Sequence, residues 1–152
     1  MLSIRAVEVD KEPVTVEALA KRLEQYWLPD ECVLYIGRAS KSVRKRVRDY
    51  YRTPLGATRP HAGGWWLKTL KVLPDLHVHF TRTNDYLQAE KAMLGEFAKR
   101  VSPGSQAALH DPERPMPFAN RKNEDDLPKR HLISGDTVPL EPVNLVGPQS
   151  LS

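Results

Sequence analysis

The spacing of apolar and polar positions along the chain predicts one small domain of helices and strands. Apolar positions that recur every three to four residues indicate helices, and short apolar or alternating runs indicate strands. The predicted elements, in chain order, are a strand over 3–9, a helix from Pro13 to before Pro29, a strand over 33–36, a helix capped by Ser42 and running through Tyr51, a short buried helix over 65–73 that ends at Pro74, a strand over 76–81, and a helix capped by Asn84 and running to about Val101.

These elements predict an α/β (α+β) fold, with a small central mixed or antiparallel sheet of about three strands flanked by helices. A chain of 152 residues is long enough for one hydrophobic core and too short for two ordinary domains. From residue 102 onward prolines are frequent and exclude long regular elements. We therefore expect a domain over 1–122, closed by Phe118 and Asn120, and a Pro-rich tail over 123–152 that is partly ordered or mobile.

Positive charge is concentrated in one segment. The formal net charge is only +4, but residues 38–52 hold seven basic residues against the single acidic Asp49. This concentration predicts a surface that faces phosphate, although a solvated helix face explains a charge run by itself. The single cysteine, Cys32, excludes an intrachain disulfide and is expected to be a buried strand residue. With no apolar run long enough for a spanning helix, we expect a soluble cytoplasmic protein.

Two features suggest chemistry. Tyr35 ends a predicted strand, and the basic helix that follows places Arg46 and Tyr50 on one face, four residues apart. Glu90 falls within the apolar stripe of the last helix, where a carboxylate is costly unless it is paired or binds a metal. A Glu at the edge of the stripe that reaches water, or pairs with an arginine of the basic helix, explains the pattern equally well.

The segment from Val33 to Tyr50 resembles the second half of the motif of the GIY-YIG endonucleases, which is Tyr-Ile-Gly followed by a basic helix with an arginine and an aromatic residue. Two further family elements follow in order, the segment Glu-Lys-Ala-Met-Leu that begins at Glu90, and Asn120 in Pro-Phe-Ala-Asn-Arg. The first half of the motif has no recognisable counterpart, and Ile4 stands where the family has a tyrosine. The resemblance extends from roughly residue 3 to residue 121.

The resemblance implies a GIY-YIG-like fold and hydrolysis of DNA phosphodiester bonds at a single Mg²⁺ or Mn²⁺ ion. Glu90 would bind the metal, since such cations need few protein ligands beside water and phosphate oxygens. Tyr35 would take a proton from the attacking water, Arg46 would bind the scissile phosphate, and Tyr50 would orient phosphate or water.

Other residues would support this site. His61 lies in a His-x-Gly-Gly segment that some members of the family share, and it is a candidate for donating to phosphate or moving a proton. Asn120 would brace the site by hydrogen bonds, an interpretation that we favour over a turn asparagine because Phe118 can anchor the segment on the core. The residues expected to contact the substrate are Gly37, Arg38, Lys41, Arg44 and Arg48.

Two alternatives to an active nuclease stay open. A catalytically degenerate module of the same fold would bind nucleic acid without cleaving it, as the missing first tyrosine suggests. In a purely structural domain, Arg46 and Glu90 would form an ion pair. The expected partner is DNA, branched or of a specific duplex sequence, with a homodimer or a partner protein supplying specificity and no role for a membrane.

Overall fold

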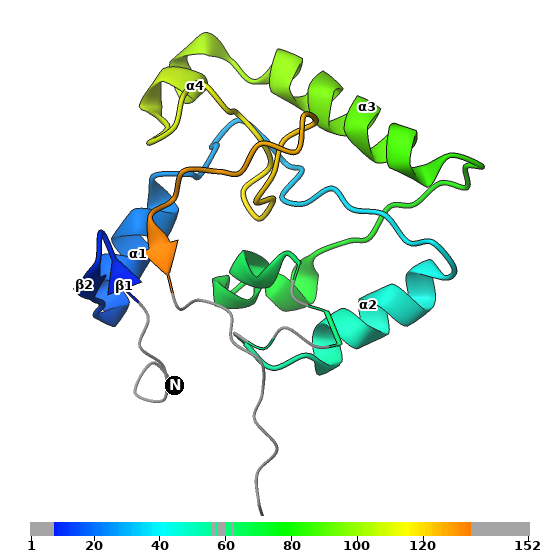
Figure 1. Ribbon diagram of the computed structural model, residues 1–152, viewed down its shortest axis with the longest axis horizontal. Coiled ribbons are helices and arrows are strands. Elements are labelled where there is room, and N and C mark those ends of the chain that lie inside the picture. Colours follow the sequence, from blue (N-terminus) through cyan, green and yellow to red (C-terminus); the bar gives the residue numbers. More distant parts are fainter. Residues whose placement is uncertain (1–7, 56, 58–59, 62, 135–152) are drawn as a thin grey trace, which may run out of the picture.

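The computed structural model describes residues 8–55, 57, 60–61 and 63–134, and its elements are joined by long irregular segments (Figure 1). The α-helices in this part of the chain are α1 (Val16–Glu24), α2 (Val43–Arg52), α3 (Tyr86–Arg100) and α4 (Pro103–Ala108). Two short 3-10 helices are η2 (Trp65–Thr69) and η3 (Leu73–Asp75), and the strands are β1 (Glu8–Val9), β2 (Glu12–Pro13) and β3 (Ile133–Ser134). The fold is α+β, with a small antiparallel sheet of three strands and four α-helices among the described residues.

The sheet joins the two ends of the described chain. Its strand order is β2-β1-β3, and Val9 of β1 pairs with both Glu12 and Ile133. Asp10 and Lys11 form the turn between β1 and β2 with φ angles of 56° and 68°, as a tight hairpin turn requires. Arg22 of α1 donates to both carboxylate oxygens of Asp10, at 3.2 and 2.5 Å, and so fastens the hairpin to this helix.

The predictions of α1, α2 and α3 are confirmed by the positions of these helices, and that of α2 also by its cap. Ser42 accepts a hydrogen bond from Lys45 N at 3.2 Å and starts α2. The predicted cap of α3 is wrong by one residue, because the side chain of Asp85, not Asn84, accepts from Gln88 N at 2.9 Å. Pro74 does not simply end the element before it, since it fits into the first turn of η3, where its missing N–H costs nothing.

The two strands predicted over 33–36 and 76–81 do not form. Leu34 O accepts from Ala119 N at 2.9 Å, and both polar groups of the Ile36 backbone are bound by a side chain, so this segment has no strand partner. Val78 and Phe80 are 56% and 71% exposed, so the alternation in the second segment does not mark a buried face. Cys32 is likewise exposed, contrary to its prediction as a buried strand residue.

The core consists of two clusters of buried side chains. The larger one is Leu23, Tyr26, Trp65, Trp66, Phe118, Ala119 and Ile133, and the other is Leu28, Ile36, Leu94, Phe97, Val101 and Leu109. The extended segments around Leu34 and Phe118 pass between α3 and α4 on one side and α2 on the other (Figure 1). The segment that contains the Tyr-Ile-Gly motif therefore runs through the middle of the domain.

Lys129 is a buried charge within the larger cluster. Its ammonium group donates to Pro117 O at 3.2 Å and Phe118 O at 2.8 Å, and it lies 4.6 Å from the ring centroid of Trp66 and 5.1 Å from that of Tyr26. Burial, opposed by Asp111, lowers the pKa of Lys129 to about 7. The segment beyond residue 122 is thus packed into the core at this point.

The predicted domain boundary, the C-terminal tail and the first part of the N-terminal strand are not tested by the described residues. The predicted boundary at residue 122 stays a prediction, although His131 and Ile133 beyond it are buried. The rest of the predicted tail, and the first part of the strand predicted over 3–9 with Ile4, lie outside the described residues. In the part of the chain that the structure describes, no helix is both long enough and apolar enough to cross a bilayer.

Candidate functional site

Tyr35 is enclosed by three glycines. A Cβ added to Gly37 would lie 2.6 Å from Cε1 of the Tyr35 ring, one added to Gly63 would lie 3.1 Å from its hydroxyl oxygen, and one added to Gly64 would lie 3.3 Å from Cε2. Gly64 also has a φ of 71°, which disfavours any other residue. The glycine pair after His61 therefore makes room for the tyrosine of the Tyr-Ile-Gly segment.

The imidazole of His61 and the hydroxyl of Tyr35 both border Gly63. Its Cε1 and Nε2 atoms are 3.2 and 3.3 Å from the position of a Gly63 Cβ, the same point that lies 3.1 Å from the Tyr35 oxygen. The backbone N–H of His61 donates to Thr53 Oγ1 at 3.0 Å. Burial, and then the positive charges of Arg46 and Lys68, lower the pKa of His61, which keeps its imidazole neutral at pH 7.

Tyr50 completes this group from α2. Its hydroxyl donates to Gly64 O at 3.1 Å, and its ring packs against that of His61 with centroids 6.0 Å apart. Burial first, and then the neighbouring Tyr51 and Tyr35, raise the pKa of Tyr50. Its phenol therefore stays protonated at neutral pH and acts as a hydrogen-bond donor, not as a base.

Arg46 lies one helical turn before Tyr50, because the two are four residues apart on α2. Its side chain is half-buried, and its charge is the first electrostatic cause, after burial, of the lowered pKa of His61. Among the residues that the structure describes, none forms a hydrogen bond or ion pair with its guanidinium. The donors of Arg46 are thus available to an anion beside His61, Tyr35 and Tyr50.

Glu90 is paired with Arg38. The guanidinium of Arg38 donates to Glu90 Oε2, and the side chains are 41% and 18% exposed, respectively. The alternative of an ion pair with an arginine is therefore observed, but with the residue after Gly37 and not with the basic helix. In the part of the chain that the structure describes, Glu90 forms no hydrogen bond or ion pair with Arg46, so the ion pair on which the purely structural alternative was based is not present.

A hard cation could bind at this site through a single protein carboxylate. In the described ranges no three His, Cys, Asp or Glu side chains gather into a cluster that could hold a metal ion. Glu90 is the predicted ligand, and its Oε1 has no hydrogen-bond partner among the described residues. One carboxylate with water and phosphate oxygens suits Mg²⁺ or Mn²⁺, provided that Arg38 shares the carboxylate with the ion.

Asn120 binds the backbone of the Tyr-Ile-Gly segment. Its Oδ1 accepts from Ile36 N and its Nδ2 donates to Ile36 O, both at 2.8 Å. Asn120 is only 8% exposed, so these hydrogen bonds are shielded from water. An amide side chain therefore replaces the strand neighbour that Ile36 would have in a sheet and holds the residue next to Tyr35.

The predicted phosphate contacts lie on the surface. Lys41, Arg44 and Arg48 are exposed, and none has an ion-pair or hydrogen-bond partner among the described residues. Lys45 differs, because its ammonium group pairs with Asp49 at 2.6 Å. These side chains form an exposed basic surface on α2, next to the half-buried Arg46.

Two residues that the sequence did not single out connect this group. Thr53 is 2% exposed, and its hydroxyl donates to Asp49 O at 2.7 Å while accepting from His61 N. Lys68 donates to Tyr50 O at 2.6 Å and also to Thr53 O. The contacts of Lys68 with Tyr50 and Thr53, and that of Thr53 with His61, join residues in different elements or loops, and no periodic pattern of residue types predicts such contacts.

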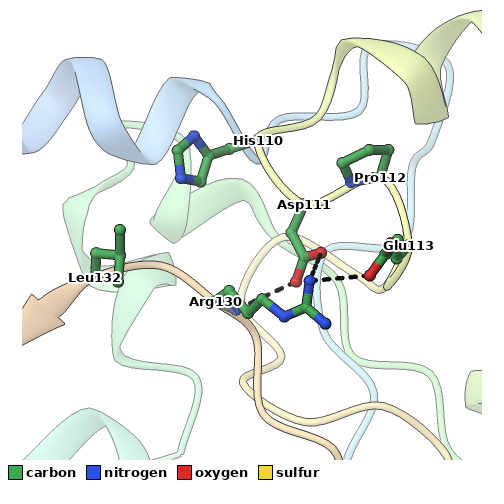
Figure 2. A pocket seen from close by; sticks show the side chains of 6 residues that line it. All are labelled: His110, Asp111, Pro112, Glu113, Arg130 and Leu132. Carbon is green, nitrogen blue, oxygen red and sulfur yellow. Dashed lines mark hydrogen bonds and ion pairs between the residues drawn. The ribbon is translucent and has the colours of Figure 1, made fainter.

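A separate pocket of about 390 Å³ lies on another part of the molecule (Figure 2). It is lined by His110, Asp111, Pro112, Glu113, Arg130 and Leu132. Arg130 donates to Glu113 at 2.9 Å and lies 3.8 Å from Asp111, so the charges in this pocket largely compensate one another (Figure 2). No residue of the predicted site lines it.

The structure thus brings Tyr35, Tyr50 and His61 together with the charge of Arg46. Glu90 is linked to them through Arg38, the neighbour of Gly37, and not by a contact of its own. Asn120 supports the segment from behind. No protein-family model, curated protein or solved structure matches this chain.

Proposed function

We propose that the protein is a divalent-metal-dependent DNA endonuclease with a single-metal site of the GIY-YIG type. The observation that supports this most strongly is the convergence of Tyr35, His61 and Tyr50 beside the unpaired guanidinium of Arg46. Three successive segments within residues 35–61 supply these groups: the Tyr-Ile-Gly segment, α2 and the loop that contains His61. A packed core has no need of an unpaired arginine beside two phenols and a neutral imidazole, whereas hydrolysis of a phosphodiester uses each of them.

Each side chain has a distinct task in this proposal. The planar fork of Arg46 binds the non-bridging oxygens of the scissile phosphate and stabilises the charge that develops there. The Tyr35 hydroxyl lies beside His61, and this pair takes the proton of the attacking water, since the neutral imidazole can accept one. Tyr50, whose hydroxyl donates to Gly64 O, holds the glycine segment in place around Tyr35.

Glu90 would hold the Mg²⁺ or Mn²⁺ ion, and the ion would supply further charge stabilisation at the phosphate. The exposed Lys41, Arg44 and Arg48 would bind flanking phosphates of the DNA, which explains why these charges have no protein partner. The proposed compartment is the cytoplasm, where DNA and millimolar magnesium are available and a single free cysteine stays reduced.

The second candidate is a nucleic-acid-binding module of the same fold without catalytic turnover. The Arg38–Glu90 pair favours it, because a carboxylate neutralised by arginine binds a cation less readily. The exposed basic surface on α2 serves both candidates equally. The two differ only in whether bound DNA is cut.

Nicking of supercoiled plasmid separates these candidates. The nuclease proposal expects nicked product with Mg²⁺ or Mn²⁺ and none with EDTA. Glu90→Ala should lower the rate by about 10²-fold or more, whereas Glu96→Ala, which removes an exposed carboxylate from the same helix, should not change it. DNA binding without metal-dependent nicking would support the binding module instead, and cleavage retained by Glu90→Ala would reject Glu90 as the metal ligand.

A further inference from the structure

Lys68 ties η2 to the end of α2. Its ammonium group donates to two main-chain carbonyls of that end, Tyr50 O at 2.6 Å and Thr53 O, and it lies 4.5 Å from the centroid of the Tyr50 ring. A cation at the C-terminus of a helix complements the helix dipole and its unpaired carbonyls. A compact ammonium with three donors suits two carbonyls and one ring face, which a planar guanidinium would match less well.

Thr53 connects this lysine to His61. The carbonyl of Thr53 accepts from Lys68, and its buried hydroxyl accepts from His61 N at 3.0 Å. The backbone of His61 is therefore held by a residue that Lys68 itself holds. Thr53 O and Thr53 Oγ1 serve the two neighbours without competition, because each uses a different acceptor.

Tyr50 also links α2 to the start of η2. Its hydroxyl donates to Gly64 O, and Gly64 is the residue from which η2, the element of Lys68, begins. The rings of Tyr50 and His61 pack together, so both site residues contact atoms that Lys68 fixes. The positive charge of Lys68 also contributes to the lowered pKa of His61, together with burial and Arg46 and against Asp49.

We propose that Lys68 is a positioning residue of the candidate site, which holds Tyr50 and the backbone of His61 in place beside Tyr35. The catalytic part of this role rests on the proposed function, whereas the geometric part does not. A lysine whose contacts and charge reached only the end of α2, and not His61, would stabilise the fold and leave the titration of His61 unchanged.

The test is an NMR pH titration of His61 in the full chain. The charged groups that act on this imidazole come from α2 (Arg46, Asp49) and from η2 (Lys68), and the titratable phenols of Tyr35 and Tyr50 lie nearby. Lys68→Met keeps the aliphatic stem and removes the charge, so the pKa of His61 should rise above its wild-type value. Lys71→Met, an exposed lysine three residues on, should leave it unchanged.

Two further variants keep the proposal falsifiable. Lys68→Arg retains the charge and should keep the pKa of His61 closer to the wild-type value than Lys68→Met does. If Lys68→Met does not fold, the pKa of His61 is measured in Lys68→Gln instead, and it should again rise. If the protein cleaves DNA, Lys68→Met should also move the acid limb of the pH–rate profile to higher pH. A His61 pKa that is unchanged by removal of the Lys68 charge overturns the proposal, whether or not the protein cuts DNA. A shifted pKa in a protein without nuclease activity supports the positioning role and counts only against the proposed function.

Discussion

Asn120 binds Ile36 with both ends of its amide, accepting from the backbone N–H and donating to the backbone carbonyl, each at 2.8 Å. This pair joins the irregular segment around Phe118 to the residue between Tyr35 and Gly37. Because Ile36 is 6% exposed, water cannot replace either hydrogen bond without opening the core. The position of Tyr35 therefore depends on a side chain 85 residues later in the chain.

Removal of this amide should destabilise the fold. Asn120→Ala leaves a buried donor and a buried acceptor of Ile36 unpaired, so we expect the free energy of unfolding to fall by about 2–4 kcal/mol. Urea unfolding measures this loss. Asn84→Ala, at an exposed asparagine next to the cap of α3, should change stability by no more than about 0.5 kcal/mol. Equal midpoints for both variants would show that the Asn120–Ile36 pair does not hold the segment.

A methyl group at Gly37 should displace Tyr35. The added Cβ would lie 2.6 Å from the ring, and the neighbouring backbone is held by Asn120, so the ring has to move. We expect Gly37→Ala to remain folded, to shift the NMR signals of the Tyr35 ring, and to lower cleavage by about 10²-fold, the usual effect of misplacing a catalytic group by about 1 Å. Gly104→Ala is the control, because nothing lies within 4 Å of its Cβ position. Unchanged ring signals would contradict the packing of Tyr35 on Gly37.

Lys129 should make stability depend on pH. Burial lowers its pKa to about 7 in the folded state, against about 10.4 in an unfolded chain. Below pH 7 both states carry the proton and the folded state bears the whole cost of the buried charge. Above pH 7 the folded lysine loses its proton first, so the free energy of unfolding should rise, by up to about 1.4 kcal/mol per pH unit. The neutral amine keeps two N–H donors, which match its two carbonyl partners.

Chemical unfolding between pH 7 and roughly pH 9.5 tests this slope. At higher pH the raised pKa values of Tyr26 and Tyr50 act in the opposite direction, because these phenols ionise earlier in the unfolded chain. Lys129→Met should remove most of the slope, whereas Lys71→Met, at an exposed position, should retain it. A methionine variant with the wild-type slope would mean that Lys129 does not titrate in this range.

The sequence alone correctly predicted elements that depend on contacts between residues close to one another in the chain. The Ser42 cap and the spacing of Val43, Val47 and Tyr50 correctly placed α2, because capping and i to i+4 contacts are local. The same holds for the buried Trp65 and Trp66, whose size makes burial the dominant effect. Alternation over 76–81 failed, since it describes a residue pattern and cannot supply the partner strand that a sheet needs.

The candidate site was predictable in its members and not in their pairing. The motif named Tyr35, His61 and Tyr50, which the structure brings together, and Asn120, which binds Ile36. It did not indicate that Arg38 pairs with Glu90, because these residues are 52 positions apart. Lys129 lay outside any prediction, because an unpaired lysine is almost never buried and nothing in its local sequence marks it. Contacts between residues distant in the sequence determine both features: an ion pair for Glu90, and hydrogen bonds to main-chain carbonyls for Lys129.

The exposed arginines of α2 should control DNA affinity. Arg44 and Arg48 are exposed without a protein partner among the described residues, so Arg44→Ala/Arg48→Ala should leave thermal stability nearly unchanged. The slope of log affinity against log salt should decrease by about one or two units, since each lost phosphate contact releases fewer counterions. Lys21→Ala/Lys71→Ala removes the same charge elsewhere and serves as the control. Equal slopes for the two double variants would show that α2 does not face DNA.

The most direct test of the proposed nuclease site is the single-turnover cleavage rate of Arg46→Ala, measured with Mg²⁺ at saturating protein concentration. Saturation removes differences in binding, so the rate reports only what Arg46 does for bound DNA. Arg52→Ala is the matched control, because Arg52 is an exposed residue at the end of the same helix. We predict a loss of about 10²-fold or more for Arg46→Ala and no loss for Arg52→Ala. Equal rates for the two variants would contradict the assignment of this cluster as the site of phosphodiester hydrolysis.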